Sequence, residues 1–108
     1  MTLNDLLEFV DHQDQVLIDV FHKNQDKDKR LLARMAKLTE EVGELSEAVL
    51  SSIRMQGSYK ESINHDELEA EVADVIICAL LIAKTTDCDV QQGLEKKIAK
   101  IKQRFQAV

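Results

Sequence analysis

The chain has 108 residues, no proline and three glycines, a composition that favours helices over strands and turns. Its 14 basic and 20 acidic residues give a formal net charge of −6, which argues against sequence-independent binding to nucleic acid. Cys78 and Cys88 are too few for a disulfide framework, and neither a signal peptide nor a membrane-spanning run is recognisable. We therefore expect a single all-α domain over residues 1–108 in the cytoplasm, with neither nucleic acid nor a membrane as a partner.

The N-terminal half predicts two helices by its apolar periodicity. The first helix is expected over Leu3–Phe21, with Thr2 as its N-cap. The polar stretch Asn24–Lys29 interrupts this pattern, and a second helix is expected over Arg30–Ile53. The following stretch, Gln56–Ser62, contains a glycine and predicts a loop.

A third helix is expected to begin after Asn64, because Glu67 stands three residues later and completes a capping-box pattern. This helix should continue to about Lys84. Its centre, Val75–Ile82, is apolar nearly all round. Such a helix is typically covered on several sides, so we expect it to be buried.

A fourth helix is expected after either Asp87 or Asp89, each of which can serve as its N-cap. Its apolar residues keep a heptad-like spacing: Leu94, Ile98, Ile101, Phe105 and Val108. Four amphipathic helices with short connections predict an antiparallel four-helix bundle. Because so small a domain buries little surface, and its second and third helices have wide apolar faces, we expect it to pair as a homodimer or a dimer of dimers.

Two pairs of acidic residues stand at helical spacing, Glu41 with Glu44 and Glu71 with Asp74. Residues three apart lie on one helix face, and each pair borders the apolar stripe of its helix. If these two helices pack antiparallel, four carboxylates converge and repel one another unless a cation neutralises them. Carboxylate oxygens suit Mg²⁺, with Mn²⁺ as a possible substitute. The alternative is that both pairs lie on ordinary solvated faces.

Gly43 stands between the two glutamates of the first pair. A glycine inside a helix costs roughly 1 kcal/mol relative to alanine. We therefore expect a neighbouring helix, a metal ion or a ligand to approach the backbone closely at this position.

The fourth helix carries five cations against a single acid, Glu95. On an acidic chain this local positive charge is a natural place for polyphosphate to bind. The alternative is a solvated face near a helix C-terminus, where cations interact favourably with the helix dipole. The five cations are Lys96, Lys97, Lys100, Lys102 and Arg104.

Three segments together resemble a known family. Lys37–Leu45 reads Lys-Leu-Thr-Glu-Glu-Val-Gly-Glu-Leu, and Glu71–Val75 reads Glu-Val-Ala-Asp-Val. In this order they are similar to the E-x-x-E…E-x-x-D signature of MazG-type all-α nucleotide pyrophosphohydrolases, and Lys100–Phe105 resembles the closing segment of that family. The resemblance covers about residues 30–106 and departs at Ile98, where that family often has asparagine.

The resemblance implies that four carboxylates ligate Mg²⁺. It also implies that Glu40 or Glu47 contacts the metal ligands without binding the metal, or orients the attacking water. The catalytic set that follows from it is Glu40, Glu41, Glu44, Glu71 and Asp74, of which the last four are the metal ligands.

The resemblance also implies where the substrate binds. Lys97, Lys100 and Arg104 would contact the triphosphate, while Phe21 and His22 would contact the base across a subunit boundary. The implied activity is Mg²⁺-dependent cleavage of a nucleoside triphosphate, in particular a dNTP, to the monophosphate and pyrophosphate, as part of nucleotide-pool house-cleaning. Two alternatives stay open: a relative of the same fold that acts on a phosphoribosyl nucleotide or on dUTP, and a non-enzymatic helical dimerisation or adaptor module.

Overall fold

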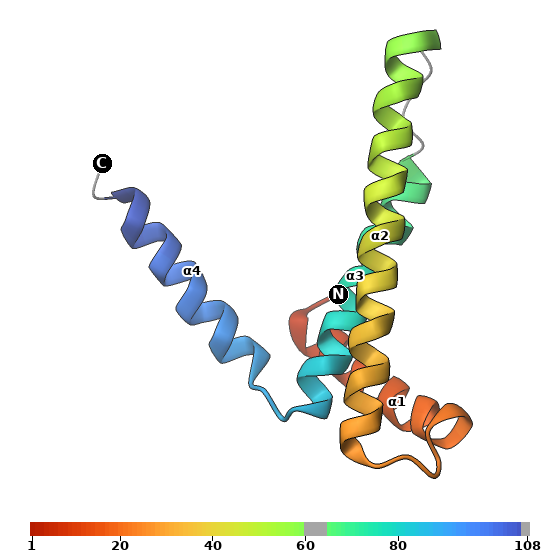
Figure 1. The fold of residues 1–108 in the computed structure, drawn as a ribbon. Helices are drawn as coiled ribbons and strands as arrows, with labels where there is room; N and C mark the ends of the chain where they lie inside the picture. Colours follow the sequence, from red (N-terminus) through yellow and green to blue (C-terminus); the bar gives the residue numbers. More distant parts are fainter. Residues whose placement is uncertain (60–64, 107–108) are drawn as a thin grey trace.

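The structure, a computed structural model, describes the backbone of residues 1–59 and 65–106, and the side chains of these residues except 54–59. Within these ranges the fold is entirely helical and has no strand, which confirms the all-α prediction (Figure 1). The described residues include no helix with the length and apolar character needed to cross a membrane. The helices in chain order are α1 (Leu3–Phe21), α2 (Lys27–Tyr59), α3 (His65–Thr85) and α4 (Val90–Gln106).

Side-chain caps fix the starts of α1 and α4. The Thr2 hydroxyl accepts a hydrogen bond from the backbone N–H of Asp5 at 3.1 Å, and the Asp5 carboxylate accepts one from the Thr2 N–H at 2.9 Å. This reciprocal pair is a capping box, which confirms Thr2 as the N-cap. Of the two caps considered for α4, the structure selects Asp89, whose Oδ1 accepts from the Gln92 N–H at 3.0 Å.

Helix α2 is longer at both ends than the periodicity predicts. Asp26 caps it through a 2.9 Å hydrogen bond from a first-turn N–H, so the helix begins at Lys27, inside the stretch expected to interrupt it. It also runs through Gly57 to Tyr59, where a loop was expected. A single glycine costs a helix only about 1 kcal/mol, too little to end one without a proline or a competing cap. The predicted cap Asn64 lies outside the described residues.

Helices α2 and α3 form an antiparallel hairpin, and α1 packs against α3 near the end of the hairpin where α2 begins (Figure 1). Helix α4 leaves this body after a turn in which Asp87 has a φ of 55°, in the left-handed region. Residues 91–106 are all exposed. The radius of gyration is 17.4 Å, against about 13 Å for a compact chain of this length. A single chain therefore packs three of the four helices of the expected bundle.

The face that α2 turns toward α3 is not centred on the apolar stripe of its sequence. Three residues at seven-residue intervals are buried along it: Arg34, Glu41 and Ala48. The predicted apolar stripe lies one position further along the sequence and is half exposed. Up to Ile53, the last α2 residue whose side chain is described, two of the three buried residues are therefore charged. The apolar stripe beside them is left available for other contacts. That exposed part of the stripe comprises Met35, Val42 and Val49.

Helix α3 is also less buried than its sequence predicts. Only Leu81 and Thr85 are buried, while Ile76 is 46% exposed despite standing in the apolar centre. The expectation of burial on several sides is thus wrong for a single chain. The physical reason is that α4 does not return to cover α3, so α3 contacts α2 and α1 only on part of its surface.

Candidate functional site

Three carboxylates from α2 and α3 meet where the two helices face each other. Glu41 is 6% exposed and belongs to the buried line of α2, while Glu71 is half-buried and Asp74 is exposed on α3. One carboxylate oxygen from each of the three lies within 4.8 Å of the other two. The antiparallel packing therefore brings acids from both predicted pairs together.

A second group shares Glu41 and lies on α2 alone. It consists of Glu40, Glu41 and Glu44, whose oxygens also lie within 4.8 Å of one another. The remaining candidate, Glu47, is exposed and belongs to neither group. Glu41 is thus the centre of the whole cluster, which we call the acidic cluster. Its five members are Glu40, Glu41, Glu44, Glu71 and Asp74.

Mutual repulsion in the acidic cluster raises carboxyl pKa values. The pKa of Glu44 is raised above its usual range first by the negative charge of Glu41 and then by burial, with a smaller contribution from Glu71. The pKa of Glu71 is raised first by burial and then by the charges of Asp74 and Glu41. Like charges and desolvation both disfavour ionised carboxylates. The ionised cluster is therefore a site that gains from a cation.

One lysine already contacts this cluster. The Lys37 ammonium lies 3.1 Å from Glu41 Oε1 and 3.6 Å from Glu40 Oε1. Its pKa is raised, chiefly by the hydrogen bond to Glu41 and the charge of Glu40. Lys37 was not among the predicted site residues, although its position four residues before Glu41 on a helix is the signal for such a pair. Among the described residues one cation faces five carboxylates, so much of the charge of these carboxylates stays uncompensated.

The arrangement fits a hard divalent cation. Glu41 Oε2 and Glu71 Oε2 are both buried and accept no hydrogen bond from the described residues. Buried carboxylate oxygens are normally paired, because an unpaired charge in the interior is costly. Carboxylate oxygens from two helices, close together and unpaired, are the ligand type that Mg²⁺ and Mn²⁺ prefer. The residues present thus suit the metal that the sequence predicts.

No neighbouring helix of the described chain approaches Gly43 closely. A Cβ atom built at this position would meet no described atom within 4 Å beyond its own helical turn. The expectation that a neighbouring helix approaches Gly43 is therefore wrong within a single chain. The space beside it is open.

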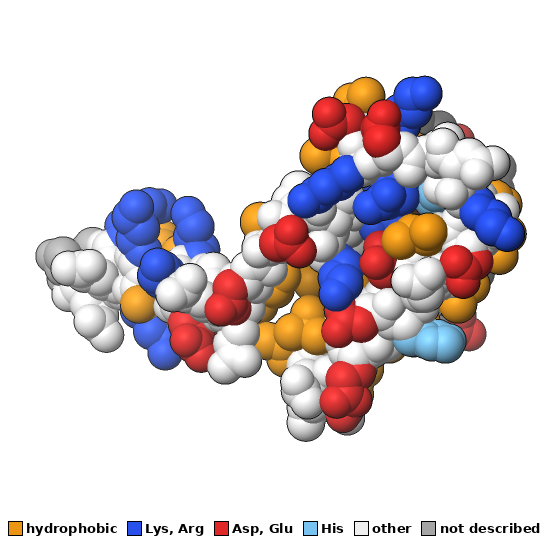
Figure 2. Space-filling view, turned by 90° about the horizontal axis from the view of Figure 1, so that it is seen from below, with side chains coloured by type: hydrophobic (Ala, Val, Ile, Leu, Met, Phe, Trp, Pro, Cys, Tyr) orange, Lys and Arg blue, Asp and Glu red, His pale blue; other side chains and the backbone are white. Residues whose placement is uncertain are grey.

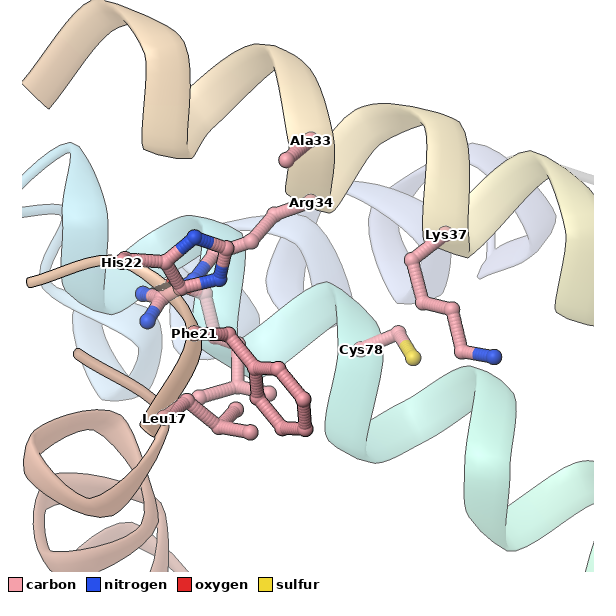
Figure 3. A pocket seen from close by; sticks show the side chains of 8 residues that line it. Leu17, Phe21, His22, Ala33, Arg34, Lys37 and Cys78 are labelled. Carbon is pink, nitrogen blue, oxygen red and sulfur yellow. Dashed lines mark hydrogen bonds between the residues drawn. The ribbon is translucent and has the colours of Figure 1, made fainter. Parts of the chain in front are cut away.

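A cavity of about 530 Å³ lies between the C-terminal end of α1 and the α2–α3 hairpin (Figure 3). Phe21 and His22, the residues predicted to contact a base, both line it. The His22 Nδ1 is 2.7 Å from Gln25 Oε1. The other walls come from the body of α1 and from α2 and α3, and include Leu17, Ala33, Arg34, Lys37, Cys78 and Leu81.

Two wall residues connect this cavity to the acidic cluster. Lys37 stands one helical turn before Glu41, and Cys78 stands one turn after Asp74. Burial raises the pKa of the Cys78 thiol, and the charge of Glu41 adds to that shift. The thiol therefore lies near enough to the acids to sense their field. The cavity and the acidic cluster therefore share no residue but are adjacent, with Lys37 contacting both.

A buried arginine, Arg34, also lines the cavity and was not among the predicted site residues. Arg34 Nη1 donates to Asp14 Oδ1 on α1 at 2.5 Å, to Thr85 Oγ1 on α3 at 2.5 Å, and to the Leu81 carbonyl at 3.4 Å. This network ties three helices together. The signal for it was the spacing, since Arg34 stands seven residues before Glu41 and shares its buried face.

The predicted phosphate-binding residues are not brought to the acidic cluster within one chain. Lys97, Lys100 and Arg104 are exposed on α4, which points away from the hairpin (Figure 1). Figure 2 shows Lys and Arg side chains gathered on this helix, separated from the rest of the molecule. A single chain therefore holds the cluster and the cavity but not the cationic residues expected to face phosphate.

Comparison with known proteins gives one match. The family model described as the MazG nucleotide pyrophosphohydrolase domain matches residues 29–108. Searches of curated proteins and of solved structures gave no significant match. The matched range contains all of the acidic cluster and α4, whereas α1 lies outside it.

Proposed function

This chain belongs to the MazG nucleotide pyrophosphohydrolase family, and on that premise we propose that it is a Mg²⁺-dependent enzyme that cleaves nucleoside triphosphates, in particular dNTPs, to monophosphate and pyrophosphate. The observation that carries the proposal is the acidic cluster, in which α2 and α3 present carboxylates within 4.8 Å of one another around the buried Glu41. The biological role would be nucleotide-pool house-cleaning by a single domain in the cytoplasm, a reducing compartment that suits its two free thiols.

Glu41, Glu44, Glu71 and Asp74 would hold the metal ion. The unpaired buried oxygens of Glu41 and Glu71 support this assignment. When bound, Mg²⁺ neutralises phosphate charge and makes water more acidic. Mn²⁺ could replace it, since both ions prefer oxygen ligands.

The remaining steps fall to side chains of the chain itself. We assign to Glu40 the role of accepting a proton from the attacking water, because it is exposed and its carboxylate lies within the acidic cluster. The Lys37 ammonium, hydrogen-bonded to Glu41, keeps that carboxylate oriented in the cluster. Phe21 and His22 would contact the base in the adjoining cavity.

Phosphate binding requires a second copy of the chain in this proposal. Lys97, Lys100 and Arg104 share one face of α4 by their spacing, and we assign them to the leaving pyrophosphate. Because α4 extends away from the acids of its own chain, they would act on the site of another subunit. The apolar face of α4 supports association, since four of its residues are 43–69% exposed: Leu94, Ile98, Ile101 and Phe105. The assembly would be a homodimer or a dimer of dimers.

Pyrophosphate release across a panel of NTPs and dNTPs, with and without Mg²⁺, tests the proposal. The panel includes dUTP and a phosphoribosyl nucleotide, so it separates the alternatives of the same fold. Glu41→Gln and Asp74→Asn should each lower turnover by more than about 100-fold, beyond what loss of an outer-shell partner causes. Glu69→Gln, an exposed residue of α3 outside the cluster, is the matched control and should retain activity. Metal-independent turnover, or full activity in Glu41→Gln, would contradict the proposal.

A further inference from the structure

The guanidinium of Arg34 uses only part of its hydrogen-bonding capacity. Nη1 donates to Asp14 and Thr85, and the side chain is 6% exposed. Nε and Nη2 are buried and have no hydrogen-bond partner among the described residues. Their two N–H groups point side by side from one edge of the planar group, a fork that suits two neighbouring acceptor atoms. Leaving both donors unpaired in the interior is unfavourable, so this fork is a candidate binding element.

Asp14 pairs with Nη1 of the same guanidinium, but the cavity that Arg34 lines adds no carboxylate for the fork. Arg34 lines the cavity of about 530 Å³, whose walls are mainly apolar and include Lys37 as a second cation but no carboxylate. Phe21 contributes an aromatic ring to the same cavity (Figure 3). An occupant that suits these walls is flat and largely apolar and brings its own acceptors.

The position of the cavity suggests which part of a substrate would reach it. Lys37 contacts both the cavity and the acidic cluster, through its 3.1 Å ion pair with Glu41. If the phosphates of a nucleotide are held at the cluster, its base extends past Lys37 toward Arg34. This step rests on the proposed function, because it takes the cluster as the phosphate end.

We propose that Arg34 is a specificity-determining residue whose Nε and Nη2 bind two neighbouring acceptors on one edge of the base. Guanine offers O6 and N7 as such a pair, and cytosine offers O2 and N3. No edge of adenine, thymine or uracil carries two neighbouring acceptors, so these bases cannot satisfy both N–H groups. The preferred substrates are therefore guanine and cytosine nucleotides, with the base stacked near the Phe21 ring.

The fork is shielded from solvent and must be uncovered for binding. Figure 3 shows the His22 ring in front of the Arg34 guanidinium, at the end of α1. His22 follows the last residue of α1. Its Nδ1 is hydrogen-bonded at 2.7 Å to Oε1 of Gln25, an exposed residue. The base would take the place of this ring, which can swing aside without breaking the helix.

Nucleoside binding to the wild-type protein without metal tests the inference first. Deoxyguanosine, deoxycytidine, deoxyadenosine and thymidine are titrated separately, with chemical-shift changes as the readout. The first two should bind roughly 5- to 150-fold more tightly than the other two, the range expected for one bidentate contact. A preference for deoxyadenosine or thymidine, or no binding by any nucleoside, would overturn the inference. So would saturable binding of inorganic phosphate in the cavity, because the fork would then serve a phosphate.

Arg34→Lys keeps the positive charge but removes the fork. It should reduce binding of deoxyguanosine and deoxycytidine to the level of the other two nucleosides and leave those two unchanged. Arg30→Lys is the matched control, because Arg30 stands one turn earlier on α2 and does not line the cavity; it should keep the wild-type ranking. An equal loss for all four nucleosides in Arg34→Lys would show a purely structural role. If this variant does not fold, the wild-type ranking alone decides.

The two proposals fail separately. Ranked nucleoside binding without any pyrophosphate release would support the role of Arg34 and contradict the proposed function. Metal-dependent pyrophosphate release that is equally fast for all four dNTPs, with no ranking of the nucleosides, would leave the proposed function intact and overturn the role of Arg34.

Discussion

Replacing Asp14 with alanine should destabilise the protein more than any other single change to an exposed or half-buried acid. The Asp14 side chain is 14% exposed and the Arg34 side chain 6%, so their ion pair is almost fully desolvated. Removing the carboxylate leaves the guanidinium with two neutral acceptors, Thr85 Oγ1 and the Leu81 carbonyl. Stranding a buried charge in this way costs about 3–5 kcal/mol. A chain of 108 residues has a total stability of about 5–16 kcal/mol, so this is a large share of it.

Urea denaturation followed by far-UV circular dichroism measures this loss. All variants are compared at one protein concentration, since association with a second copy would add to the apparent stability. Asp11→Ala is the matched control on the same helix, because the pair of Asp11 with Lys84 is 61% and 43% exposed and worth about 0–1 kcal/mol. Adding Arg34→Met to Asp14→Ala should recover part of the loss, because the double variant strands no charge.

Two results would refute this reasoning. One is a loss for Asp14→Ala that does not exceed the loss for Asp11→Ala. The other is a double variant less stable than Asp14→Ala alone, since the cost would then come from lost contacts and not from the unpaired guanidinium.

The remaining predictions concern the metal, the buried network and the assembly. Mg²⁺ at about a hundredfold excess over its Kd should stabilise the wild type by about 2.7 kcal/mol in a thermal shift assay and leave Glu41→Gln nearly unchanged; equal shifts would argue for nonspecific binding. Thr85→Val should cost about 1.5–3 kcal/mol in urea denaturation, because it removes a buried acceptor from a charged donor; a neutral effect would contradict the network. Ile101→Glu on the apolar face of α4 should shift sedimentation toward the monomer, and an unchanged profile would exclude this face from the interface. Lys100→Met and Glu41→Gln should each be inactive, and mixing them should restore about a quarter of wild-type activity if α4 serves the site of a second copy. The reason is that half of randomly mixed dimers carry one intact site. No recovery would place Lys100 in its own subunit's site.

The elements that depend on local sequence were predictable. Helix α1 has the predicted bounds, and Thr2 caps it as expected, because capping and apolar periodicity act within a few residues. The meeting of Glu41 with Glu71 and Asp74 was also predictable, since acids spaced three apart share a face and short connections favour antiparallel neighbours.

The sequence did not predict which helix or subunit covers each helix face. The apolar periodicity of α2 follows the stripe around Val42, but the buried line of α2 carries Arg34 and Glu41. Apolar residues indicate a face that can be buried, yet they do not say whether the same chain or another copy covers it. The direction of α4 depends on the turn at Asp87, where the sequence allows a left-handed backbone but does not fix the direction in which the next helix leaves.

The acidic cluster as a cation site is most directly tested by titrating the protein with Mn²⁺ and measuring free Mn²⁺ by electron paramagnetic resonance. Mn²⁺ reports on the same oxygen ligands that suit Mg²⁺. The wild type and the control Glu69→Gln should bind Mn²⁺ saturably, in competition with Mg²⁺, and Glu41→Gln should lose this binding. Wild-type protein that leaves all Mn²⁺ free, or Glu41→Gln that binds it as well as the wild type, would contradict a metal site formed by α2 and α3.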